Sequence, residues 1–64
     1  MRKYFYTLEY RWSKREPIRT FESSVYYPSK DEAYEGLGKN VEVIFRLSPD
    51  AQVLKATVNY RYVD

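Results

Sequence analysis

The chain has 64 residues, no cysteine, no histidine and a formal net charge of +2. A chain of this length forms one small domain at most (1–64), in which a single hydrophobic core is barely sufficient. Without cysteine it can form neither a disulfide nor a thiolate metal site, which a secreted domain of this size generally needs. An apolar run is also missing after Met1, so we expect a cytoplasmic protein with no signal peptide and no membrane span.

The sequence also lacks catalytic equipment. Histidine and cysteine would supply the general base near neutral pH, the commonest metal ligand and the thiol nucleophile. The segment Gly36-Leu37-Gly38 falls far short of a dinucleotide-binding fingerprint, and no phosphate-binding loop or paired-carboxylate motif occurs. We therefore expect no enzymatic activity, no cofactor and no metal.

Aromatic residues dominate the apolar composition, with eight tyrosines, three phenylalanines and one tryptophan. Such residues favour strands and bury roughly 150–250 Å² each, which compensates for a short chain. The charges are unevenly distributed: residues 1–19 are mainly basic and residues 20–50 mainly acidic. The net charge is too small to indicate a partner by itself.

Residues 2–12 alternate with a period of two, which is typical of a half-buried strand. A second strand is predicted at 18–27, after a loop that ends at Pro17, and the two strands should form a hairpin. The apolar face of the first strand consists of Tyr4, Tyr6, Leu8, Tyr10 and Trp12. The opposite face is mainly charged, and its apolar exceptions could form a second patch if they align: Phe5, Ile18, Tyr26 and Ile44.

A short helix is predicted after Pro28. Ser29 followed by Glu32 is a capping-box pattern, which marks a helix start. Gly36 and Gly38 predict the helix end, after about two to three turns of 3.6 residues.

Alternation returns at residues 41–47 and again at 53–63, and Ser48-Pro49-Asp50-Ala51 between them suits a type I turn. The predicted fold is α+β, in the order ββαββ: a four-stranded, mainly antiparallel sheet with one short helix packed on one face. The simplest strand order is 2-1-3-4.

One short helix, about 10–12 Å wide, covers only about two strands spaced 4.8 Å apart. Aromatic side chains would then be left uncovered, and tyrosine is enriched at interfaces. Our first hypothesis is a non-enzymatic protein-binding module, which docks a protein partner or a second copy through the aromatic sheet surface or an open strand edge. Two alternatives remain open. The tyrosines of the sheet could be half exposed without contacting any partner, or the chain could be a purely structural assembly subunit. The candidate contacts are Tyr10, Trp12, Tyr27, Tyr60 and Tyr62, with Arg11, Lys14 and Arg15 at the rim.

The second hypothesis is a single-stranded nucleic-acid-binding domain, because cations and aromatic rings are interleaved in Arg2-Lys3-Tyr4-Phe5-Tyr6 and Tyr60-Arg61-Tyr62. Alternation weakens this hypothesis, since it places Arg61 on the opposite face from Tyr60 and Tyr62. The candidate contacts are Arg2, Lys3, Tyr4, Tyr6 and Arg61.

The element order and the helix segment Asp31-Glu32-Ala33 resemble those of small phage-encoded proteins that bind and inhibit host enzymes, such as host RNA polymerase inhibitors. This resemblance implies a phage- or prophage-derived protein that binds a host protein. It implies no site residues.

Overall fold

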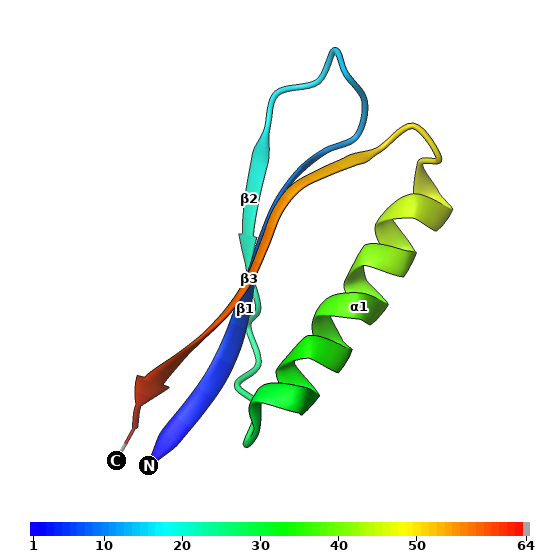
Figure 1. Cartoon of the computed structure of the whole chain (residues 1–64). Coiled ribbons are helices and arrows are strands. Elements are labelled where there is room, and N and C mark those ends of the chain that lie inside the picture. Colours follow the sequence, from blue (N-terminus) through cyan, green and yellow to red (C-terminus); the bar gives the residue numbers. More distant parts are fainter. Residues whose placement is uncertain (64) are drawn as a thin grey trace.

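A computed structural model of the chain describes residues 1–63, which form three strands and one helix. The strands are antiparallel in the order β2-β1-β3, so β1 is central. Figure 1 shows the helix lying along one face of this sheet, and the fold is α+β as expected. The molecule is elongated, with extents of 42 × 19 × 15 Å. The elements are β1 (Arg2–Arg11), β2 (Arg19–Glu22), α1 (Lys30–Leu47) and β3 (Gln52–Tyr62).

The strand predicted at 41–47 is wrong, because these residues form the second half of α1. Ala33, Leu37 and Ile44 are buried, at the spacing that places side chains on one helix face. The alternating residues Val43 and Phe45, by contrast, are exposed. The described sheet therefore has three strands and the order ββαβ, so the order ββαββ behind the resemblance to phage inhibitors is not observed.

The two glycines do not end the helix. Neither has a positive φ, and α1 continues to Leu47, after which the Ser48 N–H donates to the Ile44 carbonyl at 2.9 Å. Gly36 has a packing reason instead: a Cβ there would lie 2.3 Å from the Tyr27 hydroxyl oxygen, so only glycine lets this ring approach the helix. The predicted helix start is confirmed, because the Ser29 hydroxyl accepts from the Glu32 N–H at 3.2 Å.

The last strand takes the place beside β1 that residues 41–47 were expected to fill. Before β3, the Ala51 N–H donates to the Ser48 carbonyl at 3.0 Å, which confirms the predicted turn. In the β1–β3 register, Tyr4 lies opposite Tyr60 and Leu8 opposite Ala56. A bulge between Glu9 and Tyr10 shifts the register at the far end.

The core lies between β1 and α1. On the helix-facing side of β1, Leu8 is fully buried and Tyr6 is buried, and the Tyr6 hydroxyl accepts from the Asn40 side-chain amide at 2.8 Å. The predicted apolar face of the first strand is thus confirmed. Phe5, on the opposite face, is also buried.

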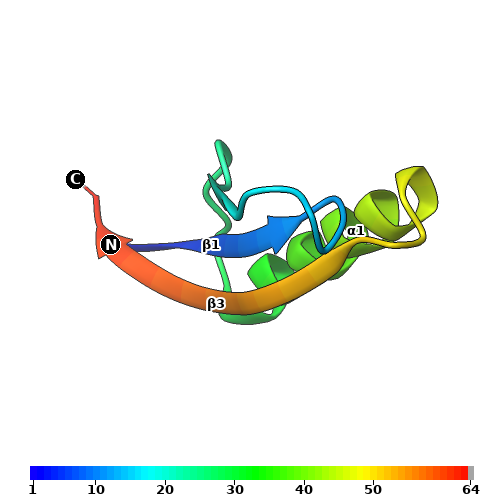
Figure 2. The same ribbon diagram turned by 90° about the horizontal axis from the view of Figure 1, so that it is seen from above.

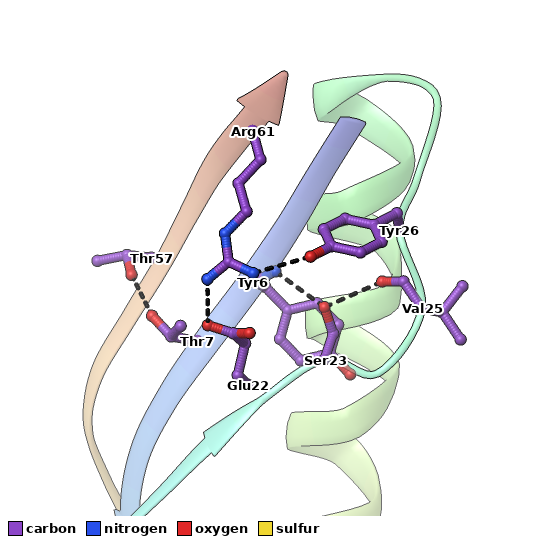
Figure 3. Close-up of polar contacts among 8 residues, drawn as sticks. All are labelled: Tyr6, Thr7, Glu22, Ser23, Val25, Tyr26, Thr57 and Arg61. Carbon is purple, nitrogen blue, oxygen red and sulfur yellow. Dashed lines mark hydrogen bonds and ion pairs between the residues drawn. The ribbon is translucent and has the colours of Figure 1, made fainter. Parts of the chain in front are cut away.

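The second strand is shorter than the predicted range 18–27. The chain leaves the ladder after Glu22 and returns only at a bridge between Tyr4 and Tyr27. Between these points the Ser23 side chain replaces a strand neighbour: its hydroxyl accepts from the Tyr6 N–H at 3.1 Å and donates to the Val25 carbonyl at 3.1 Å (Figure 3). One buried hydroxyl therefore satisfies a backbone donor and a backbone acceptor.

Replacing Ser23 with alanine is expected to destabilise the fold by about 1–3 kcal/mol, because the buried Tyr6 N–H loses its acceptor. Urea unfolding followed by circular dichroism measures this loss, and hydrogen exchange at the Tyr6 amide should accelerate with it. Ser24→Ala is the control, since Ser24 is exposed. Equal stability of the two variants would show that the Ser23 hydroxyl is dispensable.

Candidate functional site

The outer edge of β3 is the longest unpaired edge of the sheet. Within residues 1–63, β3 pairs only with β1, and it is 11 residues long, whereas β2 at the other edge has four. Figure 2 shows β3 curving along the margin of the sheet over its full length. Such an edge presents a row of backbone donors and acceptors to which another chain can pair.

The hydrogen bonds of β1 show which β3 residues face outward. Tyr4 exchanges both backbone hydrogen bonds with Tyr27 on the β2 side, at 2.8 and 2.7 Å. Opposed residues in antiparallel strands alternate between bonded and non-bonded pairs, so the pair of Tyr4 with Tyr60 is non-bonded and Tyr60 directs its N–H and C=O outward. The same alternation directs the backbone groups of Val58 and Ala56 to the open edge.

Apolar side chains border this edge on the helix side. Leu54 is 47% exposed, Tyr60 46% and Tyr34, on α1, 49%. Phe45 lies on the same side of α1 as Tyr34 by helical spacing and is also exposed. The edge therefore combines unpaired backbone groups with a discontinuous apolar border.

A cluster of aromatic rings and one cation occupies the end of this edge. The Arg2 guanidinium carbon lies 4.7 Å from the centre of the Tyr60 ring and 5.8 Å from that of Tyr62. Tyr60 also contacts Tyr4, with ring centres 6.0 Å apart, and Tyr62 at 5.5 Å. Exposed cation–π contacts are individually weak, so these contacts restrain the rings and the guanidinium only modestly.

A shallow hollow of about 390 Å³ lies between this cluster and the start of α1. None of the six side chains that line it is acidic, and two are cations. The lining residues are Arg2, Tyr4, Lys30, Val58, Asn59 and Tyr60.

The comparisons give no relative. No family model, no curated protein and no solved structure matches this chain. The geometry of the chain itself must therefore carry the assignment. Within residues 1–63, no helix is both long and apolar enough to cross a membrane, and no cluster of three or more acidic residues is suited to hold a metal ion.

The predicted protein-contact residues do not form one site. Tyr60 and Tyr62 are exposed at the end where the termini lie (Figure 1), whereas Lys14 and Arg15 are exposed in the loop between β1 and β2, at the other end. From Gln52 to Tyr60, β3 takes eight steps of about 3.4 Å, so these two ends are roughly 27 Å apart. The rings of Tyr10, Trp12 and Tyr27 are only partly accessible, because they pack against the core. Arg11 lies near the loop end, where its Nε donates to the Gln52 side-chain carbonyl at 2.7 Å.

The predicted nucleic-acid contacts are divided as well. Arg2 and Tyr4 belong to the cluster on the helix side, whereas Tyr6 is buried in the core. Lys3 and Arg61 lie opposite each other on the helix-free face. Arg2, by contrast, shares a face with Tyr60 and Tyr62.

The helix-free face has its own polar cluster, shown in Figure 3. Arg61 donates to the Tyr26 hydroxyl at 2.8 Å and to the Glu22 carboxylate at 3.2 Å, and its guanidinium lies 4.4 Å from the centre of the Phe5 ring. The second apolar patch considered for this face is not formed: Phe5 contacts Tyr26, but Ile44 lies in the core and Ile18 is exposed before β2.

Sequence reasoning missed Lys30, Val58 and Asn59 as members of the site. No residue pattern indicates that α1 begins beside the end of β3, so Lys30 could not be assigned to this site from the sequence. The alternation of the last strand did place Val58 on the helix side, so its contribution could have been found once the strand order was known.

The Tyr62 phenol should ionise at a lower pH than an ordinary tyrosine. Hydrogen bonding from Arg2 lowers its pKa, and a hydrogen bond from Tyr60 and the charge of Arg2 act in the same direction. Absorbance titration at 295 nm should show one early-ionising phenol, which Tyr62→Phe removes and Arg2→Gln shifts up towards about 10. A lowered folded-state pKa stabilises the fold only above the unfolded pKa, and this contribution disappears as the pH falls through the folded value. Arg2→Gln should therefore not change the stability at pH 7 through the ionisation of Tyr62. If both variants gave titration curves identical to that of wild type, the assignment of the early-ionising phenol to Tyr62 would be contradicted.

Proposed function

We propose that this chain is a non-enzymatic protein-binding module that docks a segment of another protein along the outer edge of β3. The observation that carries the proposal is the outward row of backbone groups at Ala56, Val58 and Tyr60, on a strand of 11 residues. An extended peptide that adds to a sheet edge gains main-chain hydrogen bonds, and adjacent side chains supply selectivity.

The surroundings of the edge support this function. Long sheet edges are normally protected by proline, charged side chains or β-bulges. In β3 the bulge and Lys55 lie before Ala56, and the stretch from Ala56 to Tyr60 has no proline, charge or bulge. The exposed rings of Tyr34 and Tyr60 offer contact area with a small entropy cost, as interface tyrosines do. Self-association through the same edge belongs to this class.

Binding of single-stranded nucleic acid is the second candidate, and it is favoured by the stacking of Arg2 against Tyr60 and Tyr62. A base would have to displace Arg2 from the Tyr60 ring before it could stack there, which ranks this candidate lower. Tyrosine fluorescence quenching by oligonucleotides, weakening steeply with salt, is its expected signature.

Ala56→Pro tests the proposed function. Ala56 is exposed and directs its N–H outward, so proline removes an edge donor without removing a β1–β3 hydrogen bond. Ala56→Ser is the matched control, because it keeps the N–H and a small side chain. Wild type and Ala56→Ser should capture the same proteins from a cell extract treated with nuclease, and Ala56→Pro should not. If Ala56→Pro has a native circular dichroism spectrum and captures those same proteins, the edge is not the docking site.

A further inference from the structure

The charges along β3 are all of one sign. Residues 52–62 contain Lys55 and Arg61 and no acidic residue. Arg61 reaches across β1 to Glu22 of β2 at 3.2 Å, whereas Lys55, opposite Glu9 of β1, forms no ion pair among the described residues. Arg61 is therefore turned away from the outer edge, and Lys55 is the cation of β3 that a docked strand can contact.

This charge distribution argues against a second copy as the occupant. Pairing of β3 with its own copy would place two lysines without ion-pair partners along one ladder, with no carboxylate on either strand. Like charges across strands are destabilising, whereas opposite charges are stabilising. A partner strand with acidic residues has the complementary pattern.

Strand alternation specifies where an acidic residue falls. Lys55 lies on the helix-free face of β3, opposite Glu9. A docked strand has the same period of two, so one of its side chains comes to lie beside Lys55 on that face. Its alternate side chains lie on the helix side, near Val58 and Tyr60.

The hollow beside Tyr60 adds one more acidic position. It is the part of the helix-facing border where two cations, Arg2 and Lys30, line a common space. A carboxylate side chain from the docked strand can enter there, while the rest of that border accepts apolar side chains.

On this basis we infer that the occupant of the β3 edge is an extended acidic peptide segment of another protein, with an acidic residue facing Lys55 on one face and, on the other face, apolar residues and an acidic residue that enters the hollow beside Tyr60. This inference rests on the proposed function. It names the chemical class of the partner, and it requires both the open edge and its charges.

Selection from a displayed library of random 12-residue peptides tests the inference. The selection is made on wild type, on Ala56→Pro and on Lys55→Glu. Peptides retained by wild type should carry one Asp or Glu on each face of an alternating sequence, and Ala56→Pro should retain none of them. Lys55→Glu should weaken a wild-type-selected peptide about tenfold and should select Lys or Arg at the position facing residue 55. A switch of selected charge cannot result from loss of folding.

Lys14→Glu is the control, because it makes the same charge change on an exposed residue at the other end of the molecule. It should leave the selected sequences unchanged. If the peptides that wild type retains and Ala56→Pro loses carry no acidic residues, the inference is overturned and the proposed function stays intact. If no peptide is retained by wild type and lost by Ala56→Pro, both are overturned.

Two further outcomes would also overturn the inference. The first is a dimer in sedimentation that Ala56→Pro dissociates, which would make a second copy the occupant. The second is displacement of the selected peptides by a single-stranded oligonucleotide that binds Ala56→Pro as tightly as wild type.

Discussion

Leu8→Ala is expected to remove a large part of the free energy of unfolding of this chain. Leu8 is fully buried at the centre of the core, between β1 and α1. Truncating a buried leucine costs about 2–5 kcal/mol, through lost transfer free energy and the cavity that remains. At roughly 0.05–0.15 kcal/mol per residue, a chain of this length has only about 3–10 kcal/mol of stability to lose.

Urea unfolding, followed by the fluorescence of Trp12, measures this effect. Trp12 packs against the core and lies edge-on to Tyr10, with ring centres 5.3 Å apart, so its emission should report loss of the core. Leu47→Ala is the matched control, since Leu47 is 70% exposed and should lose less than about 0.5 kcal/mol. Similar unfolding midpoints for the two variants would contradict the core described above.

Gly36→Ala and Gly38→Ala should shift stability in opposite directions, although both replace a helical glycine. Alanine is favoured over glycine in a helix by about 1 kcal/mol, and at Gly38 nothing lies within 4 Å of the new Cβ. Gly38→Ala should therefore stabilise the fold. At Gly36 the new Cβ would lie 2.3 Å from the Tyr27 hydroxyl oxygen and 2.7 Å from the adjoining ring carbon.

Tyr27 cannot move away freely. Its backbone is held by the two hydrogen bonds to Tyr4, and its ring packs against Tyr6 with centres 6.2 Å apart. Overpacking typically costs about 1–3 kcal/mol, which meets or exceeds the gain in helix propensity, so Gly36→Ala should destabilise the fold by up to about 2 kcal/mol.

The difference between the two glycine variants isolates the steric effect, because the propensity gain is common to both. In a Tyr27→Ala background this difference should vanish, as expected for a pair of contacting residues in a double-mutant cycle. A difference that persists without the Tyr27 ring would assign the effect to the backbone of α1 instead.

Segments whose pattern of apolar residues fits only one type of secondary structure were predictable from sequence. Residues 2–12 alternate without a competing helical pattern, and Ser29 with Glu32 marks the helix start, and both predictions are confirmed. Residues 41–47 satisfy two periods at once: their alternation predicts a strand, while Ile44 continues the helical stripe of Ala33 and Leu37. Tertiary packing decided between them. The glycines favoured the wrong choice, because the role of Gly36 depends on a tyrosine nine residues away and Gly38 lies inside the helix without a special contact.

The candidate site was less predictable for the same reason. The exposure of Tyr60 and Tyr62 was expected from surplus aromatic residues, and both are exposed. The part of the sheet that the helix leaves uncovered is smaller than predicted, because α1 has 18 residues and the sheet has three strands. The hollow depends on which strand lies beside β1, and a strand order cannot be derived from the alternation of each strand alone.

The pairing of the first and last strands has a consequence for engineering. Arg2 lies opposite Tyr62, and the Val63 N–H donates to the Met1 carbonyl at 2.8 Å, so the two ends of the described chain are neighbours in one ladder. A short covalent link could therefore join β3 directly to β1 as a hairpin. New ends opened in the loop after Ser13 would then lie far from the β3 edge near Tyr60, and that loop is also the better attachment point for a fluorophore or a surface anchor.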